Sequence, residues 1–323
     1  MKVDVLSYGE PLVRLTPERF KTFLKSNSWE VEIGGAEANV LAGCSILGLE
    51  TQLLGALPDN FLGRRVFQEL RRFGIGVDRL ELAEEGRMGL YFLEFAHRRE
   101  GAEVLYDRKD STFSHFELKE EDFSLLSQSS LLHLTGITPP LGPICDMNVR
   151  NLLRFKPATL AVSFDVNYRS KLWSPKECRQ FMEEIMGSVD VLFIKEEDLQ
   201  IIWGLENEDY REKLAFLQSR YGEDKIYVLT AGEKGCFVLS GDISLHQPSF
   251  ATEVVDRIGA GDAFVAGFLY GYLDKKSLEE AALWGNAMAS LKMSVVGDMP
   301  IFDRHFVDSL INYSQPIGKK VSR

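Results

Sequence analysis

Short continuous runs of apolar residues alternate with longer amphipathic segments along most of the chain. A continuous apolar run favours a strand that is buried on both faces, which is typical of parallel sheets. Such runs predict strands at 3–7, 51–57, 130–135, 159–165, 189–194 and 225–230, with two further late strands at 235–240 and 243–246. Helical spacing predicts helices at 36–47, 61–73, 261–273 and 278–293. This alternation predicts an α/β fold, with a doubly wound, mostly parallel sheet and helices on both faces.

A second set of segments has alternating polarity and does not fit the strand and helix alternation. Its predicted strands lie at 12–15, 29–33, 79–82, 88–95 and 102–106. Alternation of apolar and polar residues is typical of strands with one solvated face. We therefore expect segments 12–33 and 79–108 to form a small separate β-sheet that covers the site as a lid. The α/β core is then expected to comprise residues 1–11, 34–78 and 109–315.

The chain has 323 residues, a hydrophobic content of 45% and a formal net charge of −11 at pH 7. These values allow one large packed domain with a small appendage. The acidic balance argues against binding to nucleic acid or to an anionic membrane. The cysteines are scattered without a Cys-x-x-Cys pair, at Cys44, Cys145, Cys178 and Cys236. The chain starts with a predicted strand and has no apolar run of membrane-spanning length, so we expect a cytoplasmic protein with reduced cysteines.

One stretch near the C-terminal end combines a glycine turn with the start of an apolar helix. Gly259 and Gly261 permit backbone angles that a side chain would forbid. Such a turn presents free backbone N–H groups and the positive end of a helix dipole, which suits a phosphate or a developing oxyanion. Asp262 lies at its mouth and is a candidate proton acceptor for a hydroxyl that attacks phosphorus. A plain helix cap is the simpler interpretation, and no rise in the pKa of Asp262 is expected without another influence.

Further candidates lie at predicted strand ends and on the predicted lid. In the segment Gly34–Asn39, the two glycines let a ligand approach the backbone and the Asn39 amide can bond hydroxyl groups, although an ordinary tight turn is the alternative. Arg108 and Arg169 offer the planar donor set that binds a carboxylate, although each taken singly can be a surface charge. Asn286 can line an adenine pocket with Ser290, one helical turn away, or both can face water.

These motifs together resemble the ribokinase-like carbohydrate kinase family over nearly the whole chain. Gly34–Asn39, Thr230–Gly235 and Asp256–Gly267 occur in the family's order and spacing. The resemblance implies a ribokinase-like fold and ATP-dependent phosphoryl transfer to a sugar hydroxyl with Mg²⁺, with Asp262 as the base. It implies an anion hole formed by the amides of Gly259, Ala260 and Gly261. It also implies nucleotide contacts around Thr230, Gly232, Gly235 and Asn286.

Within that family, three short stretches are similar to the 2-keto-3-deoxygluconate kinase branch, namely Ala36–Asn39, Asp256–Ile258 and Gly297–Asp298. The substrate of that branch is a sugar acid, which must meet a cation. The resemblance therefore implies that Arg108 and Arg169 bind the carboxylate, while the terminal hydroxyl of 2-keto-3-deoxy-D-gluconate becomes the 6-phosphate. The other implied substrate contacts are Gly34, Gly35, Asn39, Tyr91, Tyr106, Asp262 and Asp298.

The chain departs from the family pattern in two places. The Asn-x-x-Glu motif that helps to arrange Mg²⁺ and phosphates aligns with Lys195 and Asp198 at its two ends, so Lys195 is a candidate for direct contact with phosphate and the metal ligands stay unassigned. Arg257 stands where many members have Thr, close to the monovalent-cation site that some members have near Asp256.

Three alternatives stay open: a neutral-sugar kinase such as a fructokinase, a kinase for the galactonate epimer, and a non-catalytic sugar-acid sensor. A homodimer or higher homo-oligomer through the lid sheet is expected by analogy.

Overall fold

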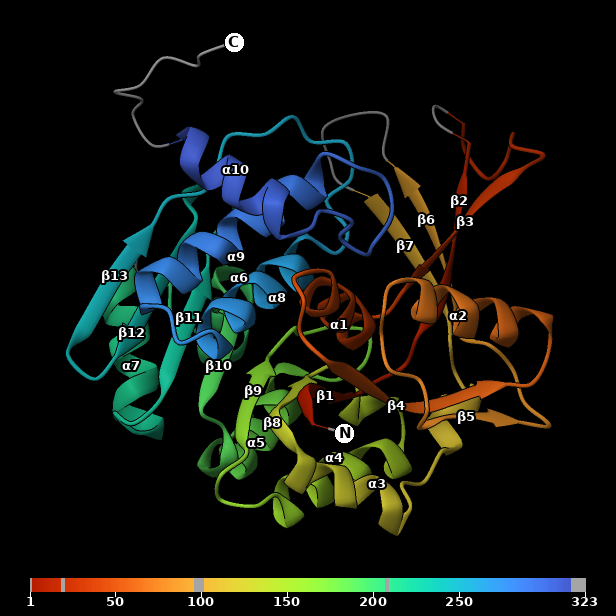
Figure 1. Cartoon of the computed structure of the whole chain (residues 1–323), viewed down its shortest axis with the longest axis horizontal. Coiled ribbons are helices and arrows are strands. Elements are labelled where there is room, and N and C mark those ends of the chain that lie inside the picture. Colours follow the sequence, from red (N-terminus) through yellow and green to blue (C-terminus); the bar gives the residue numbers. More distant parts are fainter. Residues whose placement is uncertain (1, 19–20, 96–101, 207–208, 315–323) are drawn as a thin grey trace.

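The computed structural model describes residues 2–18, 21–95, 102–206 and 209–314, which form a large sheet, a small sheet and helices on both faces of the large one (Figure 1). The large sheet consists of β1 (Val3–Tyr8), β4 (Thr51–Pro58), β5 (Leu80–Ala83), β8 (Ser129–Thr135), β9 (Ala161–Asp165), β10 (Val191–Lys195), β11 (Ile226–Thr230), β12 (Cys236–Ser240) and β13 (Ile243–Gln247). The helices are α1 (Ala36–Ile46), α2 (Phe61–Arg72), α3 (Glu120–Ser124), α4 (Pro143–Phe155), α5 (Pro175–Ile185), α6 (Glu196–Trp203), α7 (Tyr210–Tyr221), α8 (Ala260–Leu273), α9 (Leu278–Met293) and α10 (Arg304–Ser314).

The strand order of the large sheet is β13-β12-β11-β10-β9-β8-β1-β4-β5. Neighbouring strands from β11 through β5 are parallel, and β12 and β13 add an antiparallel edge. The predicted doubly wound, mostly parallel sheet is therefore confirmed. In such a sheet the carboxyl ends of the parallel strands lie along one edge, where ligands bind in α/β folds.

Side chains of the large sheet alternate between two hydrophobic layers. On β10, Leu192 and Ile194 pack with α4, α5, α6 and α7, whereas Val191 and Phe193 pack with α1, α2, α8 and α9. Because both faces are covered by helices, every second position must be apolar on each face, which produces the continuous apolar runs seen in the sequence. Figure 1 shows these two helical layers on opposite sides of the strands.

The small sheet contains β2 (Leu12–Pro17), β3 (Trp29–Gly34), β6 (Leu90–Phe95) and β7 (Ala102–Asp107), in the order β3-β2-β6-β7. It projects from one end of the molecule (Figure 1). One predicted lid strand, at 79–82, is wrong, because β5 pairs with β4 at the edge of the large sheet. The burial of Leu80 against that sheet explains its place there. Residues 1, 19–20, 96–101, 207–208 and 315, which fall within the predicted core and lid, lie outside the described residues.

All four cysteines are buried and unpaired, as the scattered spacing predicts. In the described part of the chain, no helix is long and apolar enough to cross a membrane.

Helix α8 is packed closely between α1 and α9, and small residues make this approach possible. A β-carbon added at Gly267 would lie 2.5 Å from the carbonyl oxygen of Trp284, and one at Gly271 would lie 2.7 Å from the α-carbon of Ala281. On the other side, a β-carbon at Gly43 of α1 would lie 2.5 Å from that of Ala266. The small residues of α8 therefore contact neighbouring helices, and this contact fixes where the amino end of α8 lies.

We expect the Gly267→Ala variant to be less stable than the wild type by about 1–2 kcal/mol, because forced overpacking costs more than the helix propensity gained. Thermal and urea denaturation measure the change. Gly187→Ala is the matched control, since a β-carbon there meets no atom within 4 Å. Equal stabilities of the two variants would contradict the close packing of α8 against α9.

Candidate active site

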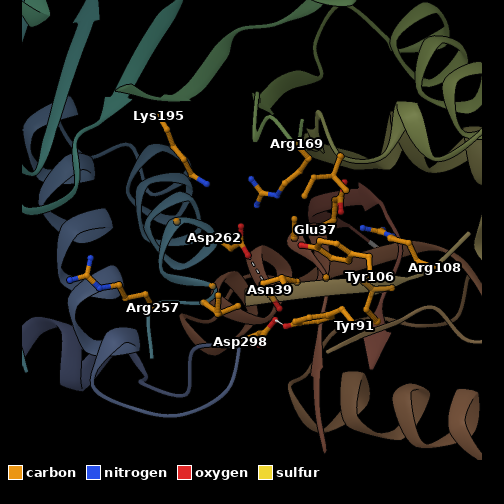
Figure 2. Close-up of a pocket in the computed structure, with 18 residues that line it drawn as sticks. Glu37, Asn39, Tyr91, Tyr106, Arg108, Arg169, Lys195, Arg257, Asp262 and Asp298 are labelled. Atoms are coloured by element: carbon orange, nitrogen blue, oxygen red, sulfur yellow. Dashed lines mark hydrogen bonds between the residues drawn. The ribbon is translucent and has the colours of Figure 1, made fainter. Parts of the chain in front are cut away.

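A pocket lies between the carboxyl edge of the large sheet and the small sheet (Figure 2). Elements that are far apart in sequence meet there, including the amino ends of α1 and α8, the ends of β9 and β10, and strands β6 and β7. Among the residues singled out from sequence, those lining the pocket are Gly35, Asn39, Tyr91, Tyr106, Arg108, Arg169, Lys195, Gly259, Gly261, Asp262 and Asp298. Those that do not line it are Gly34, Thr230, Gly232, Gly235, Ala260 and Asn286.

The glycine turn caps α8 and opens to the pocket. Gly259 has a left-handed backbone, with φ of 77°, and a β-carbon there would lie 2.0 Å from the carbonyl oxygen of Asp298. Within the described residues, the amides of Gly259 and Gly261 have no hydrogen-bond acceptor, whereas the amide of Ala260 donates to the carbonyl of Arg257 at 3.3 Å. Of these three amides, those of Gly259 and Gly261 are therefore free to donate to a ligand. The geometry supports a contribution of the Ala260 amide to the anion hole less well.

The Asp262 carboxylate lies at the amino end of α8, beside the free amides. The Asn39 side-chain amide donates to its Oδ2 atom at 2.7 Å, which fixes the orientation of the carboxylate (Figure 2). Burial raises the pKa of Asp262 above its ordinary value, and the hydrogen bond from Asn39 and the charges of Lys195 and Arg169 oppose this rise. Burial is the further influence that the expectation left open, and the sequence does not reveal it.

Two cationic side chains approach the space in front of Asp262 from opposite sides (Figure 2). The Nη1 atom of Arg169 donates to the carbonyl of Tyr168 at 3.0 Å, and no carboxylate in the described residues forms an ion pair with this arginine. The Lys195 ammonium lies 3.4 Å from Oδ1 of Asn167. Its Cε atom would lie 3.8 Å from a β-carbon at Gly261, so Lys195 reaches the glycine turn from the end of β10. Both cations are available to an anionic ligand.

Arg108 differs from Arg169 because it is already paired. Its Nη2 atom lies 2.5 Å from Oε2 of Glu10, and its Nε atom donates to the same oxygen at 2.7 Å. Both side chains are almost fully buried, at 10% and 2% exposure. Glu10 therefore balances the charge of Arg108, and the expected contact of Arg108 with a carboxylate stays a prediction. Sequence reasoning missed Glu10, and it follows β1 without any motif that would mark it.

Asp298 lines the pocket wall that faces the small sheet. Its Oδ1 atom accepts a hydrogen bond from Arg14 at 2.8 Å, and its Oδ2 atom accepts one from the Tyr91 hydroxyl. Burial raises the pKa of Asp298. A β-carbon at Gly34 would lie 2.1 Å from Oδ2, so Gly34 allows Asp298 to reach this position without itself lining the pocket. Sequence reasoning also missed Arg14.

Glu37 is a further pocket residue to which no role was given from sequence. It lies in the first turn of α1, and its Oε1 atom accepts hydrogen bonds from the hydroxyls of Thr135 at 2.7 Å and Thr138 at 2.6 Å. Burial raises its pKa. Its place directly after the Gly34–Gly35 pair was the available signal. These contacts join α1 to the loop after β8 and so help to hold the pocket wall.

The residues expected to contact a nucleotide lie beyond Lys195 along the same sheet edge. Thr230 of β11 is the register partner of Lys195 on β10. The side-chain amide of Asn286 donates to the carbonyls of Gln247 at 2.9 Å and Pro248 at 3.1 Å. A β-carbon at Gly235 would lie 2.1 Å from that same Gln247 carbonyl oxygen. Asn286 and Gly235 therefore shape the backbone after β13, and their expected contact with a nucleotide stays a prediction.

Acidic side chains surround Lys195 on its inner side. Burial raises the pKa of Asp165 to about 7, with Lys195 opposing the rise, and burial also raises the pKa of Asp198. Asp198 accepts a hydrogen bond from the amide of Tyr168 at 3.1 Å. In the described ranges, however, no three or more His, Cys, Asp or Glu side chains are grouped so that they could hold a metal ion.

Comparison with known proteins gives relatives along nearly the full length. The chain is 33% identical to 2-dehydro-3-deoxygalactonokinase of Haloferax volcanii over 302 residues, which covers 93% of this chain and 94% of the relative. The structure of 2-dehydro-3-deoxygluconokinase from Thermotoga maritima has a TM-score of 0.89 at 30% identity, covering 96% of this chain and 99% of that one. A structure from E. coli in complex with ATP and Mg²⁺ has a TM-score of 0.86 at 17% identity, covering 96% and 99%, which shows a shared fold.

A sequence model of the pfkB family carbohydrate kinases matches residues 3–303. That range contains every residue that lines the pocket, from Leu12 to Asp298. The match and the relatives confirm the resemblance that the glycine motifs indicate. The chain belongs to the pfkB family of carbohydrate kinases.

Proposed function

We propose that this carbohydrate kinase transfers the γ-phosphoryl group of ATP to the terminal hydroxyl of a 2-keto-3-deoxy sugar acid, with 2-keto-3-deoxy-D-gluconate as the substrate. One observation carries the proposal: the Asp262 carboxylate, the free amides before α8 and the guanidinium of Arg169 all face one cavity. Family membership implies ATP as the donor. The names of the relatives from Haloferax volcanii and Thermotoga maritima support a sugar acid as the acceptor.

In the proposed reaction, Asp262 accepts the proton of the terminal hydroxyl as the hydroxyl oxygen attacks the γ-phosphorus. A bond forms between this oxygen and phosphorus, the bond from phosphorus to the β,γ-bridging oxygen breaks, and ADP leaves with that electron pair. The proton is later released from Asp262 to solvent. A raised pKa makes Asp262 a better proton acceptor than an ordinary aspartate, and Asn39 holds the accepting group in place.

The turn before α8 is proposed to stabilise the phosphoryl oxygens. Amides of Gly259 and Gly261 that lack an acceptor in the described residues, together with the positive end of α8, favour negative charge at this position. Lys195 is proposed to contact phosphate from the opposite side, with the nucleotide extending past Thr230. The described residues contain no group of three or more His, Cys, Asp or Glu side chains that could hold a metal ion. Mg²⁺ is therefore proposed to bind together with ATP, where it would neutralise charge on the phosphates. ATP as the donor also supports the expected cytoplasmic location.

Arg169 is proposed to bind the carboxylate of the sugar acid, because Arg108 is already neutralised by Glu10. An arginine without an acidic partner that faces a cavity favours an anionic ligand over a neutral one. Tyr106 and Arg108 then line the other side of the acid, and Tyr91 and Asp298 face it from the wall next to the small sheet. A neutral sugar such as fructose would leave the guanidinium of Arg169 without a counter-charge.

A coupled ADP-release assay with wild-type enzyme tests the proposed substrate. We expect kcat/KM for 2-keto-3-deoxygluconate to exceed that for fructose by roughly 10–100-fold or more, the range expected for a hydrogen bond to a charged group. The galactonate epimer belongs in the same panel, because the two acids differ only in stereochemistry. A preference for fructose would refute the proposed acid site. Binding of the acid without turnover would instead identify a sensor.

The Arg169→Ala variant should raise KM for the sugar acid by roughly tenfold or more and leave KM for ATP within about twofold, because the lost contact is to the carboxylate. Steady-state kinetics with each substrate varied in turn measure both constants. Arg257→Ala is the matched control: Arg257 also lines the pocket, but its side chain is 71% exposed and its guanidinium points away from Asp262 (Figure 2). Equal effects of the two substitutions, or an effect on KM for ATP alone, would place the carboxylate elsewhere.

The Asp262→Asn variant should fold and bind ADP but lose roughly 10²–10⁴-fold in kcat, because the proton acceptor is gone. Burial raises the folded-state pKa of Asp262 above its unfolded value, so its ionised form costs stability at neutral pH and the variant should be at least as stable. In the wild type, kcat/KM should increase with pH until Asp262 is deprotonated. A variant with near-normal kcat would remove Asp262 from this role.

A homodimer is proposed to form through the outer face of the small sheet, the face opposite Arg14 and Tyr91. Leu15, Val31, Phe92 and Leu105 form one row across its four strands. Leu105 is 63% exposed, so part of this row is in contact with solvent in a single chain. Leu15 and Val31 pack against the hydrophobic layer that includes α1 and α2, so the exposed Leu105 end of the row is the part proposed to be buried against a second copy.

The Leu105→Glu variant should be monomeric at a concentration at which the wild type is dimeric, because a charge would be buried at the interface. Sedimentation velocity measures the species. The Lys176→Glu substitution, at an exposed residue in the first turn of α5, is a control for added negative charge. A wild-type protein that is monomeric at all concentrations would contradict the proposed dimer and leave the kinase proposal unaffected.

A further inference from the structure

Arg14 lies on β2 of the small sheet, and its side chain is completely buried. Its Nη1 atom lies 2.8 Å from Oδ2 of Asp256 and 2.8 Å from Oδ1 of Asp298, and its Nε atom donates to the hydroxyl of Thr16 at 2.9 Å. One nitrogen atom therefore joins two carboxylates that are far apart in sequence. Burying an ionic group is costly, and Nη2 of Arg14 is buried without a partner in the described residues. Folding stability alone therefore does not explain why an arginine occupies this buried position.

Asp256 determines how the chain enters the glycine turn. Its Oδ1 atom accepts a hydrogen bond from the amide of Ile258 at 2.9 Å, and its Oδ2 atom accepts one from the amide of Gly297 at 3.2 Å. Its carbonyl oxygen accepts one from the Lys292 ammonium at 3.0 Å. Because the left-handed Gly259 follows only three residues later, the orientation of Asp256 sets the direction in which the turn amides point.

Asp298 is held by two neighbouring side chains of the small sheet. Arg14 on β2 and Tyr91 on β6 are register partners, and each hydrogen-bonds one carboxylate oxygen of Asp298. Figure 2 shows the Tyr91 contact at the pocket wall. The carbonyl of Asp298 in turn lies against Gly259, close enough that a β-carbon there would approach it to 2.0 Å. A displacement of Asp298 would therefore be transmitted to the turn.

We propose that Arg14 is a positioning residue that couples the small sheet to the catalytic turn. Its guanidinium holds Asp256 and Asp298 together, and these two residues fix the direction of the Gly259–Gly261 amides and of the Asp298 carboxylate. Two buried cations lie beside two buried carboxylates: Arg14 and Lys292 beside Asp256 and Asp298. Without Arg14 the two carboxylates repel each other and the turn loses its support. The inference rests on the proposed function only in that phosphoryl transfer takes place at this turn.

The Arg14→Lys variant is the principal test, because lysine keeps the charge but is too short to bridge both carboxylates. We expect kcat to fall roughly 10–100-fold, with KM for the sugar acid raised and KM for ATP within about twofold. Arg87→Lys is the matched control, since Arg87 lies near the same sheet in an exposed pair with Asp107 at 2.6 Å. Constants within about twofold of the wild type, in a folded Arg14→Lys protein, would overturn the proposal.

A second control separates positioning from stability. Leu152 of α4 is fully buried in the opposite hydrophobic layer, and Leu152→Ala should lower Tm without changing kcat at a temperature well below Tm. Arg14→Lys should lower kcat at the same margin below its own Tm. If the kcat of both variants followed the folded fraction alone, Arg14 would have only a structural role.

Hydrogen exchange measured by mass spectrometry gives a readout that needs no substrate. In Arg14→Lys, peptides that cover 256–262 and 294–298 should exchange faster than in the wild type, whereas peptides from α4 should not change. Unchanged exchange in both peptides would overturn the inference even if the enzyme phosphorylated the expected acid. The opposite result is also informative. If the wild type were inactive on every sugar acid and Arg14→Lys still exchanged faster than the wild type in these peptides, the proposed substrate would be refuted and the role of Arg14 supported.

Discussion

The amino end of α8 must stay open to a cavity while the rest of the helix is tightly packed, and this constraint organises the site. Backbone amides attract negative charge only when nothing in the protein occupies them. Gly259 and Gly261 leave their amides free of acceptors in the described residues, and the contacts of Gly267 and Gly271 with α9 prevent the helix from shifting to bury them. Close packing of the rest of α8 against α9 thus keeps the amides at its amino end without acceptors.

Charge balance is the second requirement of this site, because the cavity is lined by ionic groups in a partly buried setting. Two of them are paired with ionic groups behind the cavity wall: Arg108 with Glu10, and Asp298 with Arg14. Arg169 and Lys195 are the pocket cations that lie toward Asp262 without a carboxylate ion pair among the described residues. An anionic substrate and a nucleotide phosphate would complete the balance, and this charge argument is the physical basis of the proposed sugar-acid acceptor.

The small sheet covers the pocket and also supplies side chains that contact residues next to the glycine turn. Its inner face supplies Arg14 and Tyr91 to a cluster that reaches the catalytic turn through Asp256 and Asp298. Rigid side-chain contacts of this kind are needed to hold catalytic groups within a fraction of an ångström of their working positions. A buried ionic group therefore connects the small sheet to the glycine turn before α8.

The sequence by itself determined the alternation of buried strands and helices, the separate small sheet and the glycine turn, because each depends on local periodicity or on a backbone angle that glycine alone allows readily. It also placed Asp262, Arg169 and Lys195 at the ends of predicted elements, where α/β folds bind ligands. Tertiary structure decided the rest: that β5 joins the large sheet, that Glu10 neutralises Arg108, that burial raises the pKa of Asp262, and that Arg14 joins two distant carboxylates. Pairing and desolvation depend on which groups meet in space, and the sequence pattern carries no record of contacts between residues so far apart in the chain.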